Sequence, residues 1–171
     1  MAAATGASAT PSAPPIGPGP SGAPLTVAEQ RLVGRVNASV LVGCASAKDS
    51  GTGDMVAAVN CRAAQPGPTK LPLVIQFRGV DAMNDWIGRS SAAITPVAGH
   101  TCPDGSYHDQ WTSPATGNAR AGQLVCGPAA AGGFEIMWSF DAAAVVVIAD
   151  GTDGPSLYRW WTGNAYLITS S

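Results

Sequence analysis

The most concentrated polar chemistry of this sequence lies in one short segment, residues 100–109. Both histidines of the chain occur there, together with two carboxylates, a tyrosine and a cysteine: His100, Cys102, Asp104, Tyr107, His108 and Asp109. Side chains of these types bind metals, transfer protons or contact ligands. Any histidine-dependent chemistry must therefore be built in this segment, which we expect to be part of a long loop.

Two chemical interpretations of the segment are weak. A zinc site would use His100, Cys102 and His108 with a carboxylate, and these types suit zinc, but their spacing matches no known zinc finger. A catalytic dyad of His108 with Asp109 is disfavoured because adjacent residues rarely point at one another, and no nucleophile stands out nearby. We therefore assign no catalytic residue, no metal ligand and no cofactor.

The favoured interpretation of the segment is structural. Cys102 would tether the loop, Asp104 would open a turn, and Tyr107 and Trp111 would hold the loop against the body of the domain. Long ordered loops also carry many binding surfaces, so the same segment is our candidate ligand-contact region. The candidate contact residues are His100, Asp104, Tyr107, His108 and Trp111.

Motifs and composition exclude several classes of function. The chain has no G-x-S-x-G, no H-E-x-x-H, no Walker A loop and no G-x-G-x-x-G that follows a strand. Only 12% of the residues are charged and the net charge is −2, so nucleic-acid binding is disfavoured. The longest apolar run, 142–149, is far shorter than the roughly 18 residues of a membrane helix, so we expect no membrane contact by the folded domain.

Four cysteines without a C-x-x-C pair indicate two disulfides. Of the three possible pairings we expect Cys44 with Cys61 and Cys102 with Cys126, because each pair then closes a local loop. The alternative is four buried free thiols in a cytosolic protein. Disulfides place the domain in an oxidising, extracytoplasmic compartment.

The first 24 residues are almost entirely Ala, Gly, Pro, Ser and Thr. Such a segment cannot bury enough apolar surface to fold, so residues 1–24 are predicted to be a disordered spacer before a single domain, 25–171. The spacer has neither the basic start nor the apolar stretch of a signal peptide. We therefore expect export to depend on a membrane helix upstream of this chain, which would tether the domain at the cell surface.

The first half of the domain is predicted to form a helix, two strands and a second helix. Thr26 and Glu29 have capping-box spacing and begin a helix over 26 to about 40. The β-rich segments 55–61 and 71–77 flank a Pro-Gly-Pro turn and form a hairpin. A short helix then begins at Asp81 and ends near residues 88–91.

The second half repeats this order with an additional strand. The predicted strands are 122–126, 134–140 and 145–149. A helix follows from Asp153 to Gly163, and 165–169 forms a closing strand. We predict an α+β fold with a weak internal pseudo-repeat: a two-layer sandwich in which helices cover one face of an antiparallel sheet of about five strands. Three of the five tryptophans have helix-face spacing with other apolar residues, so the tryptophans are interpreted as core residues rather than a ligand platform.

Several landmarks of the chain together resemble one known family. They are the Pro-rich spacer, the helix before Cys44, the strand 56–61, the segment Cys102-Pro103-Asp104-Gly105-Ser106-Tyr107, the strands 122–126 and 134–139, and the ending 148–161. This pattern, over most of 25–171, resembles the extracellular C-terminal domains of actinobacterial receptor-like serine/threonine protein kinases.

The resemblance implies a non-catalytic, disulfide-stapled sensor or ligand-binding module outside the membrane. Its partner would be an extracellular ligand or a cell-envelope component. Kinase activity is not carried over to any residue, because the chain has neither an H-R-D nor a D-F-G motif. The alternatives are a free-standing secreted or cell-wall-associated structural or interaction protein and, less favoured, a small secreted hydrolase.

Overall fold

The computed structural model describes residues 23–48, 50–51, 53–114 and 117–169. Most of the predicted spacer, residues 1–22, lies outside the described residues. The elements are, in chain order, α1 (Val27–Arg35), β1 (Leu41–Ser46), β2 (Met55–Ala63), β3 (Leu73–Phe77), α2 (Val80–Ser90), η1 (Cys102–Asp104), β4 (Tyr107–Ser113), β5 (Ala119–Pro128), β6 (Phe134–Phe140), η3 (Asp141–Ala143), β7 (Val145–Gly151) and α3 (Gly154–Asn164).

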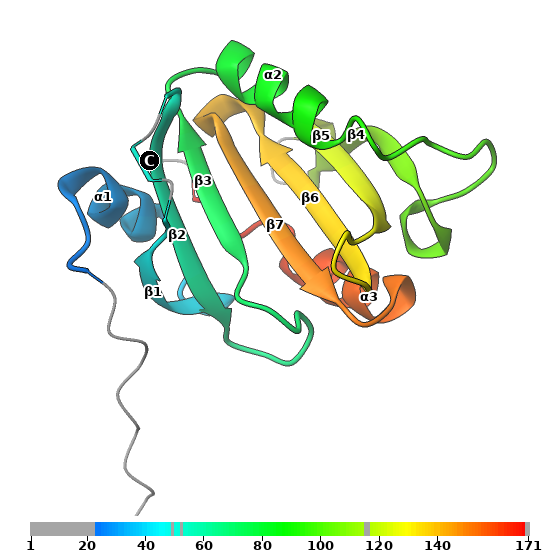
Figure 1. Ribbon diagram of the computed structural model, residues 1–171, viewed down its shortest axis with the longest axis horizontal. Coiled ribbons are helices and arrows are strands. Elements are labelled where there is room, and N and C mark those ends of the chain that lie inside the picture. The colour runs from blue at the N-terminus through cyan, green and yellow to red at the C-terminus, as the bar shows by residue number, and fades with distance from the viewer. Residues whose placement is uncertain (1–22, 49, 52, 115–116, 170–171) are drawn as a thin grey trace, which may run out of the picture.

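One antiparallel sheet organises the domain (Figure 1). Its seven strands follow the order β1-β2-β3-β7-β6-β5-β4, and every neighbouring pair is antiparallel. The five strands predicted from the sequence form its interior and confirm the α+β class. The two additional strands, β1 and β4, are the sheet edges, so the expected number of strands was too low.

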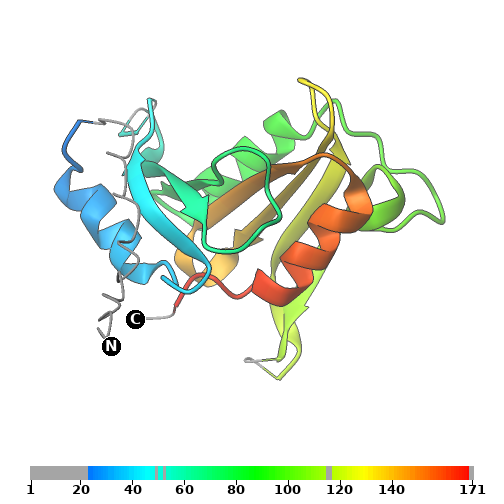
Figure 2. The same ribbon diagram turned by 90° about the horizontal axis from the view of Figure 1, so that it is seen from below.

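Helices cover both faces of the sheet, whereas one covered face was expected. Figure 2 shows α2 on one side and α1 and α3 on the other. Alternation along β7 explains this arrangement, because Val145 and Val147 point into the core under α1 and α3, while Val146 packs under α2. The strand–strand–helix order does recur along the chain, but α2 and α3 lie on opposite faces. None of the helices in the described part of the chain is long and apolar enough to cross a membrane.

Both predicted disulfides are present, and the alternative of four free thiols is wrong. Cys44 in β1 is bonded to Cys61 in β2, with Cα atoms 4.0 Å apart. Cys102 in η1 is bonded to Cys126 in β5, with Cα atoms 5.3 Å apart. Each bridge therefore ties an edge of the sheet or its neighbouring turn to an inner strand. Two disulfides in a domain of this size are typical of an extracellular or secreted protein.

Helix α1 is held by a buried carboxylate. The Thr26 backbone N–H donates to Glu29 Oε2 at 2.6 Å, and the Glu29 N–H donates to Thr26 Oγ1, which completes the predicted capping box. Glu29 is fully buried, and the Ser46 hydroxyl of β1 donates to its Oε1 at 2.5 Å. Burial alone would raise the pKa of Glu29, but hydrogen bonds from Ser46, the Thr26 backbone and Ser50 lower that pKa to about 2. This carboxylate thus joins the start of α1 to the sheet.

Helix α1 is shorter than predicted. Helix α1 ends at Arg35, and Val36 is already extended. Asn37 Oδ1 accepts hydrogen bonds from the backbone and the hydroxyl of Ser39, forming a turn that competes with the helix. The apolar positions expected to continue the helix instead lead into β1, where Leu41 is buried.

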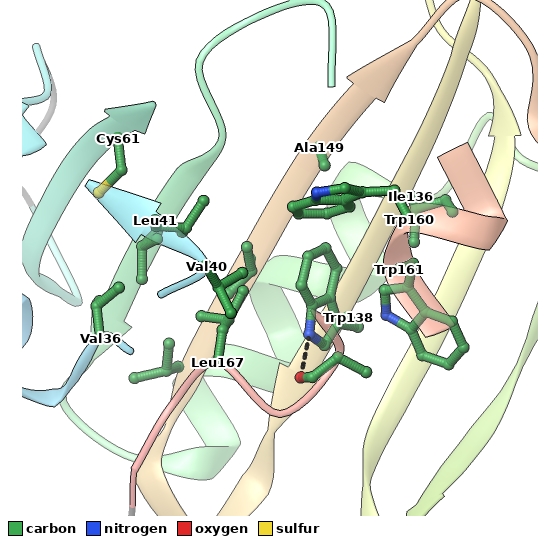
Figure 3. Close-up of a cluster of buried hydrophobic side chains, with 14 of the residues drawn as sticks. Val36, Val40, Leu41, Cys61, Ile136, Trp138, Ala149, Trp160, Trp161 and Leu167 are labelled. Atoms are coloured by element: carbon green, nitrogen blue, oxygen red, sulfur yellow. Dashed lines mark hydrogen bonds between the residues drawn. The ribbon is translucent and has the colours of Figure 1, made fainter. Parts of the chain in front are cut away.

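The C-terminal segment packs beneath the sheet without forming a strand of its own. Only an isolated bridge between Val36 and Ile168 remains of the predicted strand 165–169. Trp138 of β6 donates its indole N–H to the Ala165 carbonyl at 3.2 Å, next to Trp160 and Trp161 of α3 (Figure 3). These three tryptophans lie in the main core, as the sequence predicts.

We predict that Glu29→Gln destabilises the protein by about 1–3 kcal/mol at neutral pH, because it removes a charged acceptor of buried hydrogen bonds. The folded-state pKa lies below the unfolded value of 4.5, so this stabilisation is complete above pH 4.5 and is lost as the pH falls toward 2. Urea unfolding between pH 2 and 7 should therefore show the deficit of the variant shrinking in acid. Exposed Asp85→Asn is the matched control, and a Glu29→Gln deficit that stays constant with pH contradicts the prediction.

Candidate functional site

The polar segment singled out by the sequence is largely a strand and not a loop. Residues Tyr107–Ser113 form β4, the edge strand, which pairs with β5 from Tyr107 opposite Cys126 to Ser113 opposite Ala119. Only residues up to 106 remain outside the sheet. The expectation of a long loop failed because polar residues fill most of β4, so the segment lacks the apolar run that marks the interior strands.

The sheet separates the candidate residues. Side chains along β4 alternate between the two faces of the sheet. His108 therefore projects to one face, whereas Tyr107, Asp109 and Trp111 project to the other. A dyad of His108 with Asp109 cannot form. Cys102 is held in a disulfide and offers no thiolate to a metal. Among the residues that the structure describes, no group of three or more His, Cys, Asp or Glu side chains is placed to hold a metal ion.

His100 and Asp104 belong to the turn that precedes β4. Both are exposed. Asp104 accepts a hydrogen bond from the Thr101 hydroxyl at 2.5 Å. The ring of His100 lies against Gly105, and its Nδ1 would be 2.8 Å from a Cβ at that position. These contacts shape the turn locally and do not bring either side chain to Tyr107 or Trp111.

Tyr107 and Trp111 instead join an aromatic row along β4 and α3. Tyr158 stacks on Trp161 with ring centroids 5.3 Å apart, and Trp161 meets Trp111 edge-on at 6.1 Å. The ring of Trp111 is 5.6 Å from that of Tyr166, which is 44% exposed. Tyr107 lies near Tyr158 at the other end. This aromatic row, Tyr107, Tyr158, Trp161, Trp111 and Tyr166, gathers every tyrosine of the chain.

Trp111 is the fixed point of the aromatic row. It pairs across the strands with Gly122, and its indole N–H donates to the Ser139 carbonyl on β6 at 2.8 Å. The indole can cross β5 because Gly122 has no side chain, and a Cβ there would lie 2.0 Å from the Ser139 carbonyl oxygen. The prediction that Trp111 anchors this segment is confirmed by its burial, with 5% exposed.

Two donors in this region have unusual surroundings. Burial raises the pKa of the Tyr107 hydroxyl, and the neighbouring Asp109 carboxylate, which accepts a hydrogen bond from this hydroxyl at 3.3 Å, raises the pKa further. The phenol therefore stays protonated and acts as a hydrogen-bond donor. The indole N–H of Trp161 is buried without a hydrogen-bond partner.

On the opposite face of β4, hydrogen bonds connect His108 to two side-chain amides. His108 Nε2 lies 2.9 Å from Gln123 Oε1, and Gln123 donates to Asn84 Oδ1 of α2 at 2.6 Å. These contacts tie α2 to the sheet edge. Among the described residues, the side-chain partner of the His108 ring is thus the neutral amide of Gln123.

A pair of carboxyl groups lies at one end of β6 and β7. Glu135 and Asp150 are cross-strand partners, and Lys70 Nζ is 3.4 Å from Asp150 Oδ2. Burial raises the pKa of Glu135, the charge of Asp150 raises it further, and Lys70 opposes them. Glu135 therefore binds a proton at higher pH than an isolated glutamate.

A positively charged groove lies beside α1 and was not predicted from the sequence. It has a volume of about 550 Å³, and its lining residues are Ala28, Arg31, Gly34, Arg35, Val56 and Gln76. Arg31 and Arg35 lie four residues apart on α1, next to the face that packs on the sheet. No side-chain hydrogen bond or ion pair holds either guanidinium within the described residues, whose ion pairs are Lys70–Asp150 and Arg120–Asp141. We call this feature the arginine groove.

A bulge in β2 forms the floor of the arginine groove. Met55 is opposite Phe77 and Ala57 is opposite Gln76, so Val56 is an extra residue between two registers. Strict alternation would place Val56 on the α2 face, but the bulge places it beside Gln76 and α1. The arginine spacing was the one signal in the sequence that pointed to this groove, since neither the bulge nor the neighbouring strand is visible there.

Comparison with known proteins finds no matching family model, no matching curated protein and no matching solved structure.

We predict that Trp111→Ala lowers the free energy of unfolding by about 3–5 kcal/mol, the usual cost of removing a buried aromatic side chain. Replacing both His100 and His108 with Ala should cost less than about 1 kcal/mol, because both side chains are exposed. Chemical denaturation of the three proteins measures the difference. A double histidine variant as unstable as Trp111→Ala would show that the histidines, and not the tryptophan, hold this segment.

Proposed function

We propose that the folded domain is a non-catalytic ligand-binding module of the sensor type, located outside the cytoplasmic membrane. The two disulfides support the compartment, and the resemblance to outer domains of actinobacterial receptor-like kinases supports the sensor role. In this proposal the chain is tethered through a membrane helix upstream of it. The ligand is an extracellular molecule or a component of the cell envelope.

The observation that carries the proposal is the arginine groove. Its volume of about 550 Å³ falls within the range of small-molecule sites. It combines two cationic side chains and an amide with the apolar surfaces of Val56 and Ala28, and Val56 is 41% exposed. Polar groups that fix orientation beside an apolar wall are typical of ligand sites.

A second candidate function is supported by the aromatic row. Tyr158 and Tyr166 lie beside the open edge of the sheet at β4, and partly exposed tyrosines next to buried tryptophans are common in binding interfaces. This arrangement favours a cell-wall-associated interaction protein. Co-sedimentation with purified, insoluble cell wall should then be lost in Tyr166→Ala, whereas Thr162→Ala on the exposed side of α3 should still sediment.

The sensor proposal is tested by NMR titration of the ¹⁵N-labelled protein with phenyl phosphate, benzylamine and benzyl alcohol, which are an anionic, a cationic and a neutral probe. At least one probe should bind saturably and shift the amide signals of Gly34, Val56 and Gln76, while Gly88 on α2 stays unchanged. Shifts confined to the aromatic row would favour the second candidate. An absence of saturable shifts at the arginine groove with all three probes contradicts the sensor proposal.

A further inference from the structure

Within the part of the chain that the structure describes, no side chain balances the charges of the arginine groove. Arg31 is exposed and Arg35 is half-buried, and neither has a side-chain partner among the described residues. The Arg35 Nε–H is buried and unpaired, so this guanidinium is stripped of water on one side. A charge in such surroundings attracts an anion more strongly than a fully hydrated charge does.

We infer that the arginine groove binds a phosphate monoester that carries a small apolar group. This inference rests on the proposed ligand-binding function and names the chemical class of the ligand. Two guanidinium groups carry two positive charges, and a phosphate monoester near pH 7 carries close to two negative ones, whereas a carboxylate carries one. The planar donors of arginine match phosphate oxygens in pairs.

Apolar residues in the walls of the arginine groove would contact the apolar group of the ligand. Val56 is exposed at the bulge, and Ala28 adds a methyl group from the first turn of α1. Gln76 supplies a neutral amide on the floor. Free inorganic phosphate would leave this apolar surface in water, so an ester with a hydrophobic substituent fits the groove better than the bare ion does.

Two glycines offer a matched pair of variants. A Cβ added at Gly34, in the groove, meets no atom within 4 Å, and the same is true of Gly88 on α2. Gly34→Glu would therefore place a negative charge in the groove without disturbing the fold, and Gly88→Glu would place the same charge on a helix that packs on the opposite face. Neither residue has the positive φ that disfavours other side chains.

The test is isothermal titration calorimetry at pH 7.5 with phenyl phosphate, inorganic phosphate and benzoate. Phenyl phosphate should bind saturably and about tenfold more tightly than either competitor, because only it offers both the dianion and the ring. Arg31→Gln and Arg35→Gln should each weaken binding about fivefold or more, and Gly34→Glu about tenfold or more, while Gly88→Glu stays within about twofold of wild type. Affinity should also fall as the pH drops below the second phosphate pKa near 6.

Several results would overturn the inference. Benzoate that binds as tightly as phenyl phosphate would contradict the dianion assignment, and inorganic phosphate that binds as tightly would contradict the apolar contact. Unchanged binding in Gly34→Glu would place the site elsewhere. If benzylamine or benzyl alcohol occupies the groove in the NMR titration and phenyl phosphate does not, the phosphate assignment fails while the ligand-binding function stands.

Discussion

The buried carboxylate of Glu29 is the contact on which the functional account depends. It accepts from the backbone of Thr26 at the start of α1 and from the hydroxyl of Ser46 in β1, so a single ionised group joins the helix to the edge of the sheet. Its cost of burial is offset by hydrogen bonds that favour the charged form, as the pKa of about 2 indicates. Because Glu29 fixes the first turn of α1, it also determines where the arginines of that helix lie. The Glu29 carboxylate, which holds the helix, lies on the buried side of α1, and the guanidinium groups of Arg31 and Arg35, which are available to a ligand, lie on the groove side.

Two further constraints complete the arrangement. The bulge in β2 brings Val56 to the same side as Gln76, and the Cys44–Cys61 bridge holds β1 against β2 at the edge where Glu29 is anchored. At the other edge of the sheet, Cys102–Cys126 and the indole of Trp111 fix η1 and β4. The domain thus has one disulfide near each edge. Its candidate recognition surfaces are the arginine groove, lined by α1 and the inner strands β2 and β3, and the aromatic row beside the edge strand β4.

The interior of the sheet could be predicted from the sequence, and its edges could not. Residues 134–140 and 145–149 carry dense apolar patterns because both sides of β6 and β7 are buried. Strand β4 is polar at most positions, and β1 contains Gly43 at φ 58° within an irregular register. The cysteine pairs could be inferred because each closes a local loop. Which face of the sheet a helix covers depends on the direction in which the chain turns after the preceding strand, such as β3 before α2. Sequence periodicity carries no information on that direction. Trp111 was recognisable as an anchor, but its neighbours Trp161 and Tyr166 join it only through the packing of α3 and the residues that follow it.

The central claim is that Arg35 is a partly desolvated cation available to an anionic ligand, and the side-chain Nε–H signal of Arg35 tests this claim most directly. A buried Nε–H without a protein partner should give a slowly exchanging NMR signal in the free protein, and that signal should move when phenyl phosphate is added, while the Nε–H of exposed Arg78 should not move. An Arg35 signal that exchanges as fast as that of Arg78, or that stays in place at saturating phenyl phosphate, would contradict the account.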